Sequence, residues 1–227
     1  PPYTIGRHNA IGCTGDPKYA YAFGKVTAVT ARKKGYNVIC NPILDMVKGN
    51  CCCNMTLRSL GCDKYKVTEI ASAEAQGMHD GGVLTVGKHY PSAEGDPLID
   101  SHLAEDRSDV SREELIDYYL YPYLELNKRG LLDGIMTGHC RLPNIDDEYP
   151  ASLSKKVIGI IRELGFDPHD IKWILHSHGH IDHFGCTRML VEKFGFSVQT
   201  VATLYMVNYG VNWFFNPLIG RIINLIG

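Results

Sequence analysis

The sequence lacks the cysteine spacing that zinc ribbons and redox motifs require. Eight cysteines occur among its 227 residues, but none form a Cys-x-x-Cys pair, and three are adjacent at positions 51 to 53. This spacing favours free thiols in a reducing compartment. We therefore expect a cytoplasmic protein.

Long runs of one charge are also absent. The formal net charge is −2 and the pI is about 6.6, with Lys and Arg interspersed among Asp and Glu. A basic face for nucleic acid is therefore not indicated, and we expect no nucleic-acid partner. No secretory signal is visible, and the Pro-Pro start is typical of a fragment or a processed product.

Charge is nearly missing from the C-terminal segment. Between Val201 and Gly227 only Arg221 is charged. The segment has the length of a bilayer-spanning helix, roughly 20 residues, but asparagines and a proline interrupt it, and polar groups are costly in lipid. A buried apolar tail is the favoured interpretation, and membrane association through residues 201–227 is the alternative.

Helical and strand patterns alternate along the rest of the chain. Strands separated by helices predict βαβ units and a parallel sheet, so we expect an α/β fold, a partial (β/α)8 TIM-type barrel. Caps and hydrophobic runs mark the expected helices at residues 17–34, 64–79, 111–127, 152–164 and 184–194. Apolar runs mark the expected strands at residues 36–44, 82–87, 132–136 and 172–175.

Polar side chains follow each expected strand. Asp45, the Lys88-His89 pair, His139 and a histidine cluster that begins near His178 all occupy such positions. In a parallel barrel the loops after the strands share one rim, where active sites form. The sequence therefore predicts one functional face.

A second group of polar residues lies between Lys88 and His102. Asp100 and His102 are two residues apart, so in an extended loop they point the same way. A carboxylate beside an imidazole orients the ring, and the pair would serve as a general acid/base. Lys88 and His89 offer donors to a sugar or phosphate oxygen. An ordinary polar surface loop is the alternative.

These segments resemble glycoside hydrolase family 3, in its β-N-acetylglucosaminidase branch. Lys88-His-Tyr-Pro91 and Asp100-Ser-His102 are similar to Lys-His-Phe-Pro-Gly-His-Gly and Asp-Ser-His in that branch. The resemblance covers about residues 1–167. Further collinear matches are Ala10-Ile-Gly-Cys-Thr-Gly-Asp-Pro17, Asn41-Pro-Ile-Leu-Asp45, Arg58-Ser-Leu-Gly61, Met136-Thr-Gly-His139, Pro150-Ala-Ser-Leu-Ser154 and Glu163-Leu-Gly-Phe-Asp167.

The resemblance implies a retaining exo-glycosidase acting on a terminal β-linked N-acetylglucosaminide or glucoside, with no cofactor. It implies that Arg58, Lys88 and His89 bind the terminal sugar. It also implies that His102, oriented by Asp100, is the acid/base. Such a pair departs from the usual two carboxylates.

The chain departs from the family pattern in two places. The loop Pro91-Ser-Ala-Glu-Gly95 replaces Pro-Gly-His-Gly and is one residue longer. After Asp167 the family continues to its nucleophilic aspartate, which would fall near His178, where this chain has no carboxylate. We therefore expect impaired catalysis.

The histidine cluster resembles a different family, the metallo-β-lactamase fold superfamily with its His-x-His-x-Asp-His signature. His178 and His180 would bind one zinc ion, and Asp182 and His183 a second. The resemblance covers about residues 168–197. The superfamily takes further ligands from downstream, but no His or Asp follows His183. Binding of a single metal ion by the local histidines is therefore the favoured form of a metal site.

The chain thus looks like a chimera of two truncated hydrolases. We expect a family 3 partial barrel at residues 1–167, a metallo-β-lactamase-like βα segment at 168–197 and an unassigned apolar tail at 198–227. Open edges of an incomplete barrel would favour self-association. A zinc-dependent hydrolase and a non-catalytic sugar-binding remnant are the alternatives to a glycosidase, and carbohydrate is the expected partner.

Overall fold

The computed structural model describes residues 7–46, 57–91 and 107–165. The chain divides into two compact units, Pro1–Phe166 and Asp167–Gly227. All the described residues belong to the first. The expected strand at 172–175, the helix at 184–194 and the apolar tail lie outside the described residues.

Two helices open the described chain. α1 (His8–Thr14) was not predicted from the sequence, whereas α2 (Pro17–Lys33) confirms the helix expected at residues 17–34. Asp16 caps α2, because its Oδ1 accepts a hydrogen bond from the Lys18 backbone N–H at 3.0 Å. Gly35, at a φ of 88°, then allows the left-handed turn that leads into the sheet.

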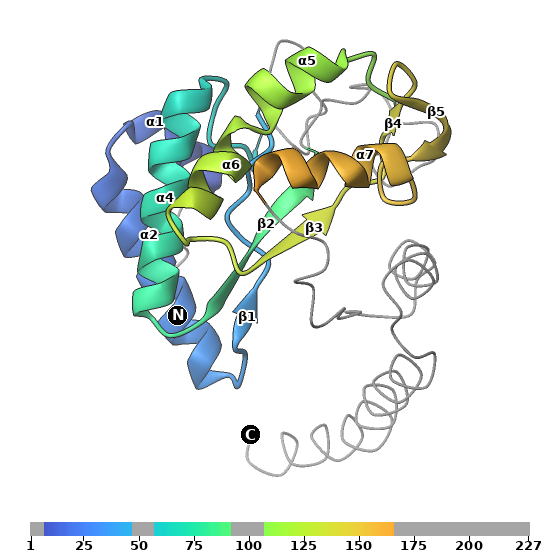
Figure 1. The fold of residues 1–227 in the computed structure, drawn as a ribbon. Helices are drawn as coiled ribbons and strands as arrows, with labels where there is room; N and C mark the ends of the chain where they lie inside the picture. Colours follow the sequence, from blue (N-terminus) through green and yellow to red (C-terminus); the bar gives the residue numbers. More distant parts are fainter. Residues whose placement is uncertain (1–6, 47–56, 92–106, 166–227) are drawn as a thin grey trace, which may run out of the picture. The chain divides into compact units, whose positions relative to one another are not determined.

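The next described helix, α4 (Lys64–Asp80), packs lengthwise against α2, as Figure 1 shows. The Asp63 carboxylate caps it by accepting from the backbone N–H groups of Tyr65 and Lys66. The two helices approach so closely that a Cβ on Gly77 would lie 2.2 Å from the Tyr21 carbonyl oxygen. Glycine is required there because no side chain fits.

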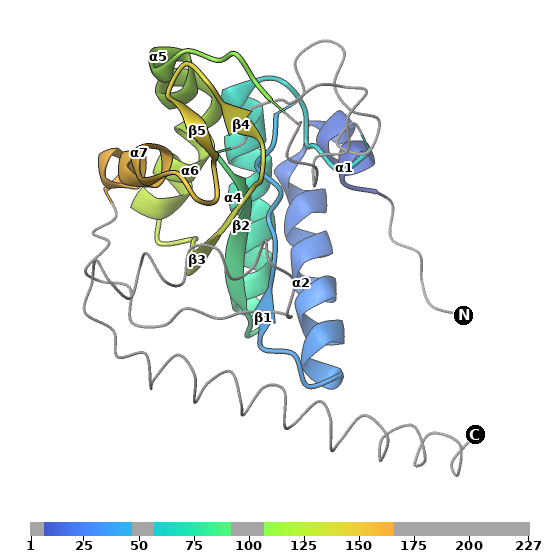
Figure 2. The same cartoon turned by 90° about the vertical axis from the view of Figure 1, so that its right-hand side faces the viewer.

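Three parallel strands form the main sheet in the order β1-β2-β3, namely β1 (Val38–Ile39), β2 (Leu84–Tyr90) and β3 (Gly134–Thr137). All three were expected, but β1 is shorter than predicted, and β2 continues past its predicted end at residue 87. Lys88 and His89 are therefore part of the strand. Figures 1 and 2 show the carboxyl end of β3 leading toward the small β4–β5 sheet.

The helix expected at residues 111–127 is broken. Ser111 begins it, as its Oγ accepts from the Glu114 N–H at 3.1 Å. The chain then forms α5 (Arg112–Glu114), a π-helical turn η1 (Leu115–Tyr119) and α6 (Tyr121–Lys128). Pro122 has no N–H to donate to the preceding turn, which explains why a regular α-helix cannot continue through it.

An antiparallel pair, β4 (Arg141–Leu142) and β5 (Asp146–Pro150), follows β3 and was not predicted. The expected helix at 152–164 divides into α7 (Lys155–Gly159) and the 3-10 turn η2 (Ile160–Leu164). Ser154 caps α7 and links it to β5: its Oγ accepts from the Val157 N–H at 3.0 Å and donates to Asp146 Oδ2 at 2.6 Å.

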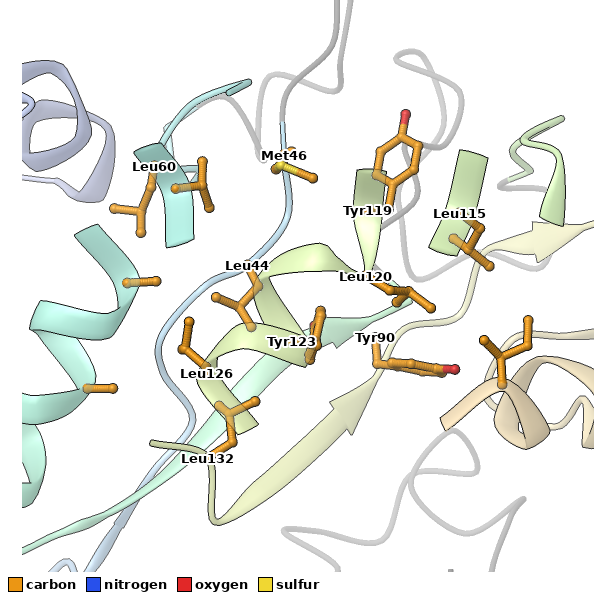
Figure 3. Packing of buried hydrophobic residues seen from close by; sticks show 14 of the residues in the cluster. Leu44, Met46, Leu60, Tyr90, Leu115, Tyr119, Leu120, Tyr123, Leu126 and Leu132 are labelled. Carbon is orange, nitrogen blue, oxygen red and sulfur yellow. The ribbon is translucent and has the colours of Figure 1, made fainter. Parts of the chain in front are cut away.

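The core lies between the sheet and the helices (Figure 3). Tyr90 and Tyr123 pack edge to face there, with ring centroids 5.8 Å apart, and the Tyr90 hydroxyl donates to the Val157 carbonyl at 2.8 Å. This contact joins β2, α6 and α7. No helix in the described part of the chain is both long and apolar enough to cross a membrane.

Candidate functional site

The site forms where the chain after β1 runs beside the end of β2. Ile43 bridges Lys88 in parallel, the Lys88 N–H donates to the Pro42 carbonyl at 3.2 Å, and the Leu44 N–H donates to the Lys88 carbonyl at 2.7 Å. This pairing carries Asp45 to the same edge of the sheet as His89. Polar residues at the carboxyl ends of parallel strands thus meet, as the sequence predicted.

Asp45 holds His89 through both its backbone and its ring. The Asp45 carboxylate accepts the His89 backbone N–H, at 3.2 and 3.1 Å to its two oxygens, and lies 2.8 Å from His89 Nδ1. Both side chains are largely buried, with 12% of Asp45 and 25% of His89 exposed. The ring is therefore fixed in orientation.

Arg58 contacts the opposite edge of the same ring. Its Nη2 lies 3.4 Å from His89 Nε2. A carboxylate can only accept and a guanidinium can only donate, so these partners assign the proton of a neutral ring to Nδ1 and leave Nε2 as an acceptor. The neighbours of His89 thus select one tautomer.

Lys88 lies half-buried beside this pair. Burial lowers the pKa of the Lys88 ammonium below its ordinary value, and the positive charge of Arg58 lowers it further. The charges of Cys40, Asp45 and Glu74 act in the opposite direction and raise that pKa. Lys88 is therefore a partly desolvated donor whose charge depends on nearby anions.

His139 lies on the next strand end. Its Nδ1 is 3.4 Å from the Oγ of the buried Ser152. The preceding Gly138 donates its N–H to the Tyr90 carbonyl, and a Cβ on Gly138 would lie 3.4 Å from the Cβ of His89. His139 thus belongs to the same rim, at the side of β3.

A buried polar cluster that the sequence did not reveal lies behind the rim. His8, Asn41 and Glu74 come together there from α1, the end of β1 and α4. Asn41 Nδ2 lies 2.6 Å from Glu74 Oε1 and 2.7 Å from His8 Nε2. Asn41 and Asp45 belong to a family-like segment, but His8 and Glu74 carry no motif. Helix periodicity alone does not show which residue is buried against a neighbouring helix.

The structure brings together three of the sequence-predicted site residues, Arg58, Lys88 and His89. The predicted acid/base pair, Asp100 and His102, lies outside the described residues. So do the four predicted metal ligands, His178, His180, Asp182 and His183. Within the described residues, no group of three or more His, Cys, Asp or Glu side chains is arranged to hold a metal ion.

A comparison with family models identifies the family of the chain. The model for the glycosyl hydrolase family 3 N terminal domain matches residues 5–170. A second model, for the metallo-beta-lactamase superfamily, matches residues 145–207 and overlaps the first. The second match covers the smaller part of the chain and shows similarity only.

Curated relatives point to the same family. A beta-hexosaminidase of Tolumonas auensis is 38% identical over 114 residues, which is 50% of this chain and 33% of that protein. The chain thus spans about a third of the length of that relative.

Solved structures are similar over a larger part of the chain. A glycoside hydrolase family 3 beta-N-acetylglucosaminidase from Paenibacillus sp. superposes with a TM-score of 0.64 at 31% identity, over 69% of this chain and 30% of that one. Zn-bound CbsA from Thermotoga neapolitana gives 0.64 at 29% identity, over 70% and 34%. These neighbours imply a TIM-like α/β fold, of which the described residues form a partial parallel sheet. The chain belongs to the glycosyl hydrolase family 3 N-terminal domain family.

Proposed function

We propose that this chain binds the terminal sugar of a β-linked N-acetylglucosaminide or glucoside, as part of a glycoside hydrolase. The observation that carries the proposal is the joint placement of Arg58, Lys88 and His89 at one strand end, with Asp45 fixing the histidine. Two cationic donors and one oriented imidazole acceptor suit the vicinal hydroxyl groups of a sugar.

In the proposed reaction these residues hold the sugar, and His102, oriented by Asp100, acts as acid/base. A retaining enzyme forms a covalent glycosyl intermediate on a nucleophile, which water then hydrolyses. The sequence places no carboxylate at the expected nucleophile position near His178. Loss of a nucleophile costs several orders of magnitude in rate, so we propose sugar binding with impaired turnover.

Calorimetry with N-acetylglucosamine tests the binding, and release of an aryl group from an aryl N-acetyl-β-glucosaminide tests turnover. We expect saturable binding in the full chain and its loss in His89→Ala. Absence of binding by folded wild-type protein would reject the proposed function. Binding with no turnover at all would favour the non-catalytic sugar-binding remnant over the glycosidase.

The similarity of residues 145–207 to the metallo-beta-lactamase superfamily favours a second candidate, a metal-dependent hydrolase. His178, His180, Asp182 and His183 would hold zinc, since imidazole and carboxylate are suitable ligands. This candidate predicts about two metal ions per chain by elemental analysis and loss of ester or lactam hydrolysis on chelation. Sugar binding that survives chelation would separate the two activities.

The junction in the chain, its cellular compartment and its self-association are further proposals. We propose that it joins segments of two hydrolases near Asp167, acts in the cytoplasm and associates through strand edges. Sedimentation over a range of concentrations tests the association, and a single size at all concentrations would reject it.

A further inference from the structure

We propose that Glu74 is a positioning residue for the sugar site, one that fixes the chain from residue 41 to residue 45, which pairs with Lys88 and ends at Asp45. The inference rests on the proposed function, since it describes how Lys88 and Asp45 are prepared for a sugar. It assigns a role in binding to a side chain on α4, outside the strand-end motifs.

Glu74 is a fully buried carboxylate with one oxygen in use. Its side chain has 0% exposure, against 17% for His8. Oε1 accepts from Asn41 Nδ2 at 2.6 Å and lies 3.2 Å from His8 Nε2. Oε2 is buried without a hydrogen-bond partner among the described residues. A buried acid held in this way is costly for stability alone, so a functional role is the better explanation.

The anchored Asn41 begins the segment that supports the site. Its carbonyl accepts from the Val86 N–H at 3.1 Å, which ties it to β2. The next residues pair with both backbone groups of Lys88, and the segment ends at Asp45, which holds His89. Glu74 therefore fixes one end of a five-residue segment whose other end orients the imidazole.

The charge of Glu74 also acts on Lys88. Burial and Arg58 lower the pKa of the Lys88 ammonium, while the Glu74 carboxylate raises it. Charges in a buried setting are screened by salt less than exposed ones. Glu74 thus helps Lys88 to remain protonated, and only the protonated form offers three donors to a sugar.

The test measures the titration of Lys88 in the full chain by NMR of 13C-labelled lysine, with the signal assigned through Lys88→Met. Glu74→Gln and Glu74→Met both remove the charge, and the second also removes the buried polar atoms. We expect both to lower the Lys88 midpoint and to weaken N-acetylglucosamine binding about three- to tenfold at mildly alkaline pH. Glu74→Asp retains the charge and is expected to restore the midpoint.

Glu69→Gln is the matched control, since Glu69 lies on the same helix but is exposed and pairs with Arg129. It should leave the Lys88 midpoint and sugar binding unchanged.

An unchanged Lys88 midpoint in either folded charge-free variant would overturn the proposal. Failure of both variants to fold beside a folded Glu69→Gln would also overturn it, because Glu74 would then serve the fold. If the wild type binds no sugar, the proposed function fails, while the Lys88 titration still decides the role of Glu74.

Discussion

Asp45 binds His89 at two points, since one carboxylate accepts both the backbone N–H and the ring Nδ1–H of the histidine. Through this double contact the orientation of the ring depends on the path of the chain after β1. The imidazole therefore presents Nε2 as an acceptor on the side of Arg58.

Replacement of Asp45 by Asn should disturb sugar binding more than stability. The amide can donate where the carboxylate only accepted, so the ring loses its fixed tautomer. A hydrogen bond to a charged group contributes about 1.5–3 kcal/mol, so we expect N-acetylglucosamine affinity to fall about ten- to hundredfold by calorimetry. Asp109→Asn, at an exposed carboxylate that pairs with Arg107, is the control. Equal affinities for wild type and Asp45→Asn would contradict this role.

Lys88→Met should lower the affinity for sugar and raise the stability of the fold. At neutral pH the variant no longer buries an ammonium, and we expect it to gain about 0.5–2 kcal/mol in the free energy of unfolding while losing sugar affinity. Because the folded pKa of Lys88 is lowered, wild-type stability rises as pH climbs from that pKa toward the ordinary lysine value. The gain of the variant should therefore shrink with rising pH.

Denaturant unfolding at several pH values measures this gain, and Lys66→Met, at an exposed position of α4, is the control. A variant that is less stable than wild type at neutral pH would show that Lys88 contributes to the fold. A gain that grows with pH would contradict the direction of the pKa shift.

Asp146 should contribute stability that depends on pH. The Ser154 hydroxyl, the Glu148 N–H and the Lys156 charge lower the pKa of its carboxyl group. The stabilisation is therefore complete above the ordinary aspartate pKa and is lost as pH falls through the lowered folded pKa. Asp146→Asn should cost about 1–3 kcal/mol at neutral pH, with a difference from wild type that shrinks in acid. Asp147→Asn, at an exposed neighbour, should cost little at any pH.

Gly77→Ala tests the close packing of α2 against α4. The added Cβ would lie 2.2 Å from the Tyr21 carbonyl oxygen and 2.9 Å from the Lys25 nitrogen. We expect a loss of about 1–3 kcal/mol through overpacking, seen as a lower midpoint in thermal unfolding. Gly159→Ala on α7 meets no atom within 4 Å and should instead raise stability by about 0.5–1 kcal/mol. Equal effects of the two changes would show that the helices separate easily.

The sequence predicted the elements that carry strong local signals. Asp16, Asp63 and Ser111 each cap a helix that the sequence predicted. The helix expected from residue 152 is capped two residues later, by Ser154. The β4–β5 pair was missed because its two strands are short and form only through contact with each other. The break at Pro122 was missed although proline is a local signal against a continuous helix.

Site residues, like the helices and strands, were predictable where the local sequence carries a strong signal. Arg58, Lys88 and His89 stand next to recognisable strand ends and motifs, and the structure brings them together. The burial of Glu74 could not be predicted, because one acidic residue in an amphipathic helix looks like an exposed one until the packing of α2 and α1 is known. The roles assigned to Asp100, His102 and the histidine cluster stay predictions.

The close packing of α2 against α4 also bears on Glu74, because a glycine on α2 lies against the backbone of that residue. A Cβ on Gly24 would lie 2.1 Å from the Glu74 carbonyl oxygen, so any larger residue must push α4 outward at the level of that acid. If Glu74 positions the sugar site as proposed, we expect a larger residue at position 24 to change sugar affinity without contacting the sugar. A survey of variants confined to ligand-contacting residues would overlook it.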